Sequence, residues 1–272
     1  MCDVEFAERE RRSHRVGTLY PLVGNTVPSA YTVPMEPRSR PATLVWMRER
    51  ERAVRPQLSE EKIVRCAIEM ADADGIDALS MRRIATRLGT GTTSLYRHIT
   101  GKEELIELMV DAVHGEHPAP AATGDDWRAQ LADAARGFRA ALLRHPWLAQ
   151  QAARRPALGP NVVARTDRVL GIAALATDDP TLAGMVVELV NTYVLGHTGA
   201  ELAELEAQRA TGMTENEWRE SVGVYVRQVV ESGRYPHFNR RVLEADDPDA
   251  DARFEFGLHC LLTGIAALVD RR

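Results

Sequence analysis

The sequence predicts an all-α fold in two domains, a small N-terminal one and a larger C-terminal one. Aromatic residues make up only 6% of the chain while 44% of the residues are hydrophobic, so a core must consist mainly of Ala, Leu, Val and Ile, which favours helices over sheets. Apolar residues also recur at helical spacing along most of the chain from Ser59 onwards. A length of 272 residues suits a small module joined to a larger one.

Residues 1–47 are predicted to be an irregular or flexible leader. They contain five prolines between positions 21 and 41 and sustain neither a helical nor a strand period. Because recognisable organisation begins only near Met47, Met35 or Met47 is an alternative translation start. Residues 1–15 contain no apolar run, and the uncharged apolar stretches of the chain are far shorter than the roughly 20 residues of a membrane span, so we expect a cytoplasmic protein.

Cysteine spacing gives no sign of a disulfide or a metal site. The three cysteines, Cys2, Cys66 and Cys260, are widely separated and form no CxxC pair. No metal and no cofactor are therefore expected.

Residues 48–102 are predicted to form a helix-turn-helix domain. A first helix follows Ser59 and ends at Asp74-Gly75, and Ser80 can cap a second helix over residues 81–88 that stops at Gly89. A third helix begins after Thr90-Gly91 and is expected to run through about Ile99. Two short helices joined by a glycine-containing turn and supported by a longer one are typical of this motif.

The charge distribution favours DNA binding by this domain. The chain is acidic from residue 103 onwards, with 17 Lys and Arg against 26 Asp and Glu, yet residues 80–102 contain five cations and no acid. Such a local excess is typical of a surface that contacts phosphates. A plain helical hairpin would explain the periodicity but not this cationic run. Four further arginines just before the first helix resemble a minor-groove arm, although two interleaved glutamates halve its charge: Arg48, Arg50, Arg52 and Arg55.

Residues 103–272 are predicted to form a second, wholly helical domain. A helix starting at Lys102 leads into it, and breakers separate the further helices, which are expected over residues 126–144, 147–154, 160–175, 180–206, 215–232 and 250–270. The stretch 235–248 is expected to be irregular.

The run SMRRIATRLGTGTTSLYRHITGKEEL, residues 80–105, resembles the helix-turn-helix of the tetracycline-repressor family of bacterial transcription regulators. Weaker resemblance to the effector-binding domain of that family covers residues 125–203 and 252–269, so the similarity extends over most of the chain beyond Met47. It implies a transcriptional repressor that binds a pseudo-palindromic DNA operator as a homodimer and is released by a small-molecule effector, with domain 48–102 binding DNA and domain 103–272 binding the effector and the partner.

The resemblance places the third helix in the major groove of DNA. Arg82 matches a family position that reaches a guanine, and Arg97 is the second candidate for a base contact, with hydroxyl groups at the start of the helix beside them. Tyr96, His98 and Lys102 match positions that hold phosphates. The hydroxyl residues are Thr92, Thr93 and Ser94. Tyr96 is equally well interpreted as a core ring with its hydroxyl outward.

The last helix carries two adjoining stripes that predict a dimer interface. One is apolar, and the resemblance implies that the other, of small residues, meets a partner in a four-helix interface with the helix from Pro180. The apolar stripe is Phe254, Leu258, Leu261, Leu262, Ile265 and Leu268, and the small-residue stripe is Gly257, Cys260, Gly264 and Ala267.

The resemblance also implies an effector pocket among the middle helices. The residues proposed to line it are Phe138, Leu142, Trp147, Val187, Asn191, Tyr193 and His197. Ala152 stands where the tetracycline repressor has a metal-coordinating histidine, and Ala134 stands where it has a drug-binding asparagine. Magnesium-tetracycline is therefore not the expected effector.

Two other classes of function remain as alternatives. A DNA-binding activator or architectural protein without an effector would show the same helix-turn-helix. An all-helical enzyme would need an active site built from residues such as His145, but no nucleophile elbow, HExxH motif, P-loop or dinucleotide fingerprint occurs.

Overall fold

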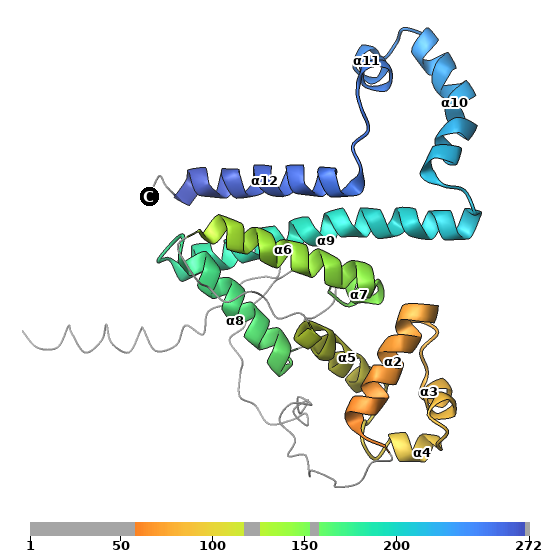
Figure 1. Cartoon of the computed structure of the whole chain (residues 1–272), viewed down its shortest axis with the longest axis vertical. Helices are drawn as coiled ribbons and strands as arrows, with labels where there is room; N and C mark the ends of the chain where they lie inside the picture. Colours follow the sequence, from red (N-terminus) through yellow and green to blue (C-terminus); the bar gives the residue numbers. More distant parts are fainter. Residues whose placement is uncertain (1–57, 117–125, 153–157, 270–272) are drawn as a thin grey trace, which may run out of the picture.

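The computed structural model describes residues 58–116, 126–152 and 158–269, and within these ranges the regular structure is entirely helical (Figure 1). The leader over residues 1–47 and the arginine arm lie outside the described residues. The N-terminal domain comprises α2 (Glu60–Asp74), α3 (Met81–Arg87) and α4 (Thr92–Leu95), and α5 (Lys102–Glu116) leads out of it. The second domain comprises α6 (Trp127–Arg144), α7 (Trp147–Ala152), α8 (Pro160–Ala174), α9 (Pro180–Thr211), α10 (Glu215–Glu231), α11 (Pro236–Glu244) and α12 (Ala250–Val269).

Local sequence signals set the ends of α2 and α3 as expected. The Ser59 hydroxyl accepts a hydrogen bond from the Lys62 amide at 3.2 Å, and the Ser80 hydroxyl accepts one from the Arg83 amide at 3.3 Å. Gly89 has φ of +64° in the turn between α3 and α4, a conformation in which a side chain would be strained. These caps and this turn place α3 and α4 at an angle in the expected helix-turn-helix.

Three elements differ from the sequence expectation. Helix α4 ends at Leu95 rather than near Ile99, because the chain tightens there and the His98 amide bonds to the Leu95 carbonyl three residues back. Helix α9 continues to Thr211 and ends at Gly212, whose φ is +70°. The stretch 235–248, expected to be irregular, contains α11, because Pro236 occupies the first helical turn, where its missing amide costs nothing.

Helices α6, α8 and α9 pack on one another, and α12 runs antiparallel along α9 and also contacts α6 (Figure 1). Helix α5 lies between the two domains and packs on both α2 and α8. One continuous hydrophobic core therefore extends from the helix-turn-helix into the second domain. Helices α10 and α11 contact each other, bury no residue and extend away from this core.

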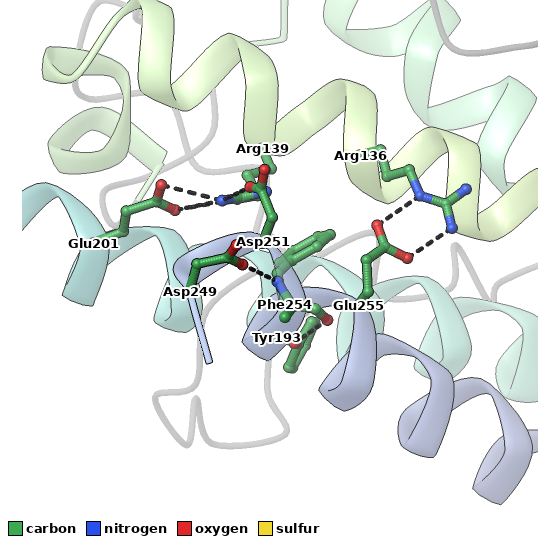
Figure 2. Close-up of polar contacts among 9 residues, drawn as sticks. Arg136, Arg139, Tyr193, Glu201, Asp249, Asp251, Phe254 and Glu255 are labelled. Carbon is green, nitrogen blue, oxygen red and sulfur yellow. Dashed lines mark hydrogen bonds and ion pairs between the residues drawn. The ribbon is translucent and has the colours of Figure 1, made fainter. Parts of the chain in front are cut away.

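Helix α12 is the one helix among the described residues that is long and apolar enough to cross a membrane. In this structure, Phe254, Leu258 and Leu262 are buried against the rest of the domain. Arg136 of α6 forms a two-pronged ion pair with Glu255, with both distances 2.8 Å (Figure 2). The length and composition of α12 thus fit a packed helix of the second domain.

A buried carboxylate fixes α5 to α8. Both Asn161 and Val162 at the start of α8 donate their backbone amides to Asp111 Oδ1, at 2.9 and 3.0 Å, and the Asn161 side chain donates to Asp111 Oδ2 at 2.9 Å. The negative charge also interacts favourably with the positive end of the α8 dipole. Burial raises the pKa of Asp111, although these hydrogen bonds oppose the rise. We call this contact the α5–α8 joint.

Gly159 is required by the α5–α8 joint, which leads to a first prediction. A Cβ at this position would lie 2.1 Å from Asp111 Oδ1. Gly159→Ala should therefore push the carboxylate off the helix terminus and lower the free energy of unfolding by about 1–3 kcal/mol, measured by urea denaturation. Gly137→Ala on α6 is the matched control, since a Cβ there meets no atom within 4 Å, and it should stabilise the helix by about 0.5–1 kcal/mol. Equal effects of the two substitutions would contradict the role assigned to Gly159.

Candidate nucleic-acid interface and effector domain

The acid-free run over residues 80–102 forms α3, the turn and α4, at the end of the molecule opposite α10 and α11 (Figure 1). The inner side of the motif is apolar, with Ile84, Leu95 and Ile99 fully buried. The side chains predicted to contact DNA lie on the outside: Arg82, Thr92, Thr93, Tyr96, Arg97 and Lys102 are exposed, and Ser94 and His98 are half-buried. Tyr96 is 52% exposed, which argues against its interpretation as a core ring.

Intramolecular ion pairs divide the four arginines of this surface into two kinds. Arg83 pairs with Asp74 at 2.6 Å and also donates to the Ala78 carbonyl at 2.8 Å, and Arg87 lies 3.4 Å from Glu69. Arg82 and Arg97 form no ion pair or side-chain hydrogen bond with the described residues, so their guanidinium groups are available to another molecule. They are the two arginines that the sequence proposes for base contacts.

Lys102 stands at the first position of α5, next to the helix-turn-helix. Its ammonium group lies 3.4 Å from the Ile76 carbonyl in the link between α2 and α3. This long contact leaves most of the donor capacity of the lysine free for a phosphate.

The residues proposed for the effector pocket come from α6, α7 and α9. Phe138, Leu142, Val187 and Asn191 are buried on α6 and α9. Asn191 is one of the few buried polar residues among those described. The remaining three proposed residues, Trp147, Tyr193 and His197, make contacts elsewhere.

Trp147 belongs to a second contact between the domains. Its indole Nε1 donates to Asp72 Oδ1 of α2 at 2.7 Å, and His145 Nδ1 lies 2.8 Å from the same oxygen. The other ring nitrogen of His145 lies 3.4 Å from Glu116, the last residue of α5. We call this contact the Asp72 joint. Because both nitrogens of the buried His145 face carboxylates, its role fits structural support better than general-base chemistry.

Tyr193, which Figure 2 shows, and His197 contribute to the contact between α9 and α12. The Tyr193 hydroxyl donates to the Phe254 carbonyl at 2.7 Å, and the His197 ring meets the Phe254 ring edge-on at 5.3 Å. Arg139 of α6 lies 4.7 Å above the Phe254 ring and pairs with Glu201 and Asp251, at 2.9 and 2.7 Å. Burial lowers the pKa of His197, whose Nδ1 has no hydrogen-bond partner among the described residues.

The outer side of α9 and α12 is apolar, and two assignments within it are corrected. Leu268, expected to pack inward, is 66% exposed. Gly257, expected to face a partner, lies instead against Tyr193 of its own domain, where a Cβ would come 2.5 Å from the hydroxyl. Both errors have the same cause: the way α12 packs on α9 determines which side of α12 is buried, and that side differs slightly from the one estimated from the sequence. The exposed residues of this surface, called the α9–α12 face below, are Met185, Leu189, Gly196, Ala200, Phe256, Cys260, Gly264, Ala267 and Leu268.

The structure also brings together three residues that the sequence reasoning missed as a group. Arg165 of α8 lies with its guanidinium 4.5 Å above the Phe138 ring, and the His114 ring of α5 lies 6.1 Å from the same ring. Burial lowers the pKa of His114 to about 4, with the positive charge of Arg165 as the second cause. A sequence signal existed, because Arg165 falls at helical spacing between the apolar residues Val162 and Val169.

His114 leads to a pH prediction. The unfolded chain has the ordinary histidine pKa of 6.5, so between pH 6.5 and about 4 it binds a proton that the folded protein excludes. The stability that depends on a neutral His114 is complete above pH 6.5 and is lost as the pH falls, by about 3 kcal/mol in all. His114→Gln should remove this part of the acid sensitivity in urea titrations at several pH values. The exposed His259→Gln should retain it, and identical pH profiles for all three proteins would refute the assignment.

A helix-turn-helix with exposed, unpaired arginines, joined through two polar contacts to a larger helical domain, defines a two-domain DNA-binding regulator. Comparison with known proteins specifies the family. Residues 63–109 match the family model described as "Bacterial regulatory proteins, tetR family", and residues 119–269 match "Tetracyclin repressor-like, C-terminal domain". The chain belongs to the TetR family and is a DNA-binding transcriptional repressor.

Known relatives align with this chain along nearly their whole length. The transcriptional repressor DrrR1 of Streptomyces coeruleorubidus is 40% identical over 86% of this chain and 87% of its own. The class A tetracycline repressor from transposon 1721 of Escherichia coli is 30% identical over 77% and 91%. The crystal structure of ActR from Streptomyces coelicolor in complex with actinorhodin has a TM-score of 0.64 and 30% identity, covering 78% and 97%. These relatives are regulators of transcription, and the predicted all-α fold with its two domain types is confirmed.

Proposed function

We propose that this repressor binds a pseudo-palindromic operator as a homodimer and that a small molecule in the second domain releases it. The observation that supports this most directly is the pair of exposed, unpaired arginines on the helix-turn-helix, Arg82 and Arg97. The α5–α8 joint and the Asp72 joint connect that surface to the second domain. A ligand that prefers a different arrangement of these joints would change DNA affinity by its difference in affinity for the two states. The structure of ActR in complex with actinorhodin supports the proposal that a small molecule regulates this protein.

In this proposal the residues of the surface form two groups, one that contacts bases and one that contacts phosphates. Arg82 and Arg97 read base edges in the major groove together with Thr92, Thr93 and Ser94. Tyr96, His98 and Lys102 hold phosphates, which sets the position of the protein without reading sequence.

Two substitutions test this division. Arg82→Ala should remove about 1–3 kcal/mol of discrimination at one base pair in each half-site, whereas Lys102→Ala should weaken binding to all sequences and reduce the salt slope by about one. Fluorescence anisotropy with operator and single-base variants at several salt concentrations measures both effects. Arg168→Ala, which removes an exposed arginine from α8, is the control and should bind as the wild type does. Equal, sequence-independent losses for Arg82→Ala and Lys102→Ala would remove Arg82 from the base-reading set.

The α9–α12 face is the proposed dimer interface. Exposed side chains such as Phe256 and Met185 alternate on it with small residues such as Gly264 and Gly196, which allow a partner helix to approach closely. Two copies of the face would form a four-helix interface, and a two-fold dimer presents two recognition helices to a palindromic site.

Phe256→Glu should disrupt the dimer. A carboxylate in an apolar interface is expected to raise the dimer dissociation constant by about a hundredfold or more, which sedimentation analysis measures. The same replacement of the exposed Val163 on α8 should leave the dimer intact. If the protein with Glu at position 256 stays dimeric at micromolar concentration, the interface lies elsewhere.

The second domain does not offer the ligands of a tetracycline-magnesium complex. Ala134 and Ala152 have only methyl groups at the two positions discussed above, so neither can coordinate a metal ion or form a hydrogen bond to the drug through its side chain. The residues present therefore do not fit chelated magnesium, and the proposed effector is a different molecule.

A further inference from the structure

Arg165 is a cation inside the second domain with no anionic partner. It lies on the inner face of α8, where its nearest recorded contact is the Phe138 ring, 4.5 Å from the guanidinium carbon. No hydrogen bond or ion pair joins it to any described residue, whereas Arg136 and Arg139 on neighbouring α6 each have two carboxylate partners. A guanidinium has five N–H donors, and stacking on a ring satisfies none of them.

Burial of the Arg165 charge is unfavourable in the protein without a bound ligand. Protein surrounds Arg165 so closely that desolvation lowers its pKa to about 10. A cation removed from water without an opposite charge destabilises a fold, and a cation–π contact offsets only part of that cost. Arg165 is therefore poorly explained as a residue that holds the fold together.

The described groups around Arg165 supply no negative charge. Protein lies on nearly all sides of Arg165, and part of the side chain remains accessible to solvent, so an incoming molecule can reach it. Its titratable neighbour His114 is neutral at pH 7 because burial lowers its pKa to about 4. Phe138, next to both residues, is buried and apolar. One positive charge thus stands beside an apolar wall, with no carboxylate of the described residues against it.

We propose that the effector is an organic acid, and that Arg165 binds its carboxylate while the apolar body of the molecule lies against Phe138. The planar, forked donors of a guanidinium match the two oxygens of a carboxylate, and that pairing is strongest where water is excluded. The inference rests on the proposed ligand-responsive function and specifies the chemical class of the ligand. Because Arg165 is on α8, a ligand bound to it acts on the helix that the α5–α8 joint connects to α5.

The first test needs no ligand. Arg165→Met keeps most of the side-chain volume and removes the unpaired charge, so the free protein should melt about 2 °C or more above the wild type. Arg168→Met, on the exposed side of the same helix, should change the melting temperature by no more than about 1 °C. A lower melting temperature for Arg165→Met would mean that the arginine supports the fold, and would overturn the proposal.

The second test compares acids with their neutral amides. 2-Naphthoate and benzoate should raise the melting temperature of the full-length protein, and 2-naphthamide and benzamide should need about tenfold higher concentrations or more for the same shift. The preference for acids should disappear in Arg165→Met and persist in Arg168→Met. Equal responses to acid and amide in the wild type, including no response to either, would overturn the proposal.

Operator binding, measured in parallel by anisotropy, separates this inference from the proposed function. If the wild type binds no specific DNA but distinguishes acid from amide, the proposed function fails and the acid site stands. If the protein binds its operator and is released equally by acid and amide, the function stands and the assignment of Arg165 is wrong.

Discussion

The buried Asp111 carboxylate at the start of α8 is the interaction on which the rest of the structure depends. It is a charge removed from water, and it is tolerated because two backbone amides and the Asn161 side chain donate to it. Gly159 is the residue that allows the chain to pass close enough for these bonds. Without the joint, α5 would be attached to α8 mainly by apolar packing, which fixes helix orientation less specifically than directed hydrogen bonds.

The Asp72 joint adds a second point of attachment on the other side of the helix-turn-helix. One carboxylate oxygen receives the Trp147 indole and lies against His145, so the first helix of the DNA-binding domain is tied to the corner between α6 and α7. Two attachments at separate points restrict rotation of the small domain in a way that one could not. Arg82 and Arg97 therefore occupy a defined position relative to the α9–α12 face. A dimer needs this fixed placement if its two recognition helices are to match the spacing of two half-sites.

Part of the candidate site could be predicted from the sequence because its signals are local. Ser59, Ser80 and Gly89 set helix ends through contacts within a few residues, and the cationic run is visible in the sequence itself. The groups formed by distant residues could not be predicted in this way. Trp147 pairs with Asp72, which lies 75 positions earlier in the chain, and no local pattern indicates that contact.

Helical periodicity, capping residues and a locally unbalanced charge were sufficient to determine the all-α class and the helix-turn-helix, while the choice of Arg82 and Arg97 as candidates came from the family resemblance of residues 80–105. These features depend on neighbours within one or two turns, which the order of residues specifies directly. Only the tertiary structure decided which arginines have carboxylate partners, which face of α12 remains exposed, and that Arg165 has no carboxylate partner among the described residues. Those outcomes depend on how helices distant in sequence pack together, and packing determines both desolvation and the charges within reach.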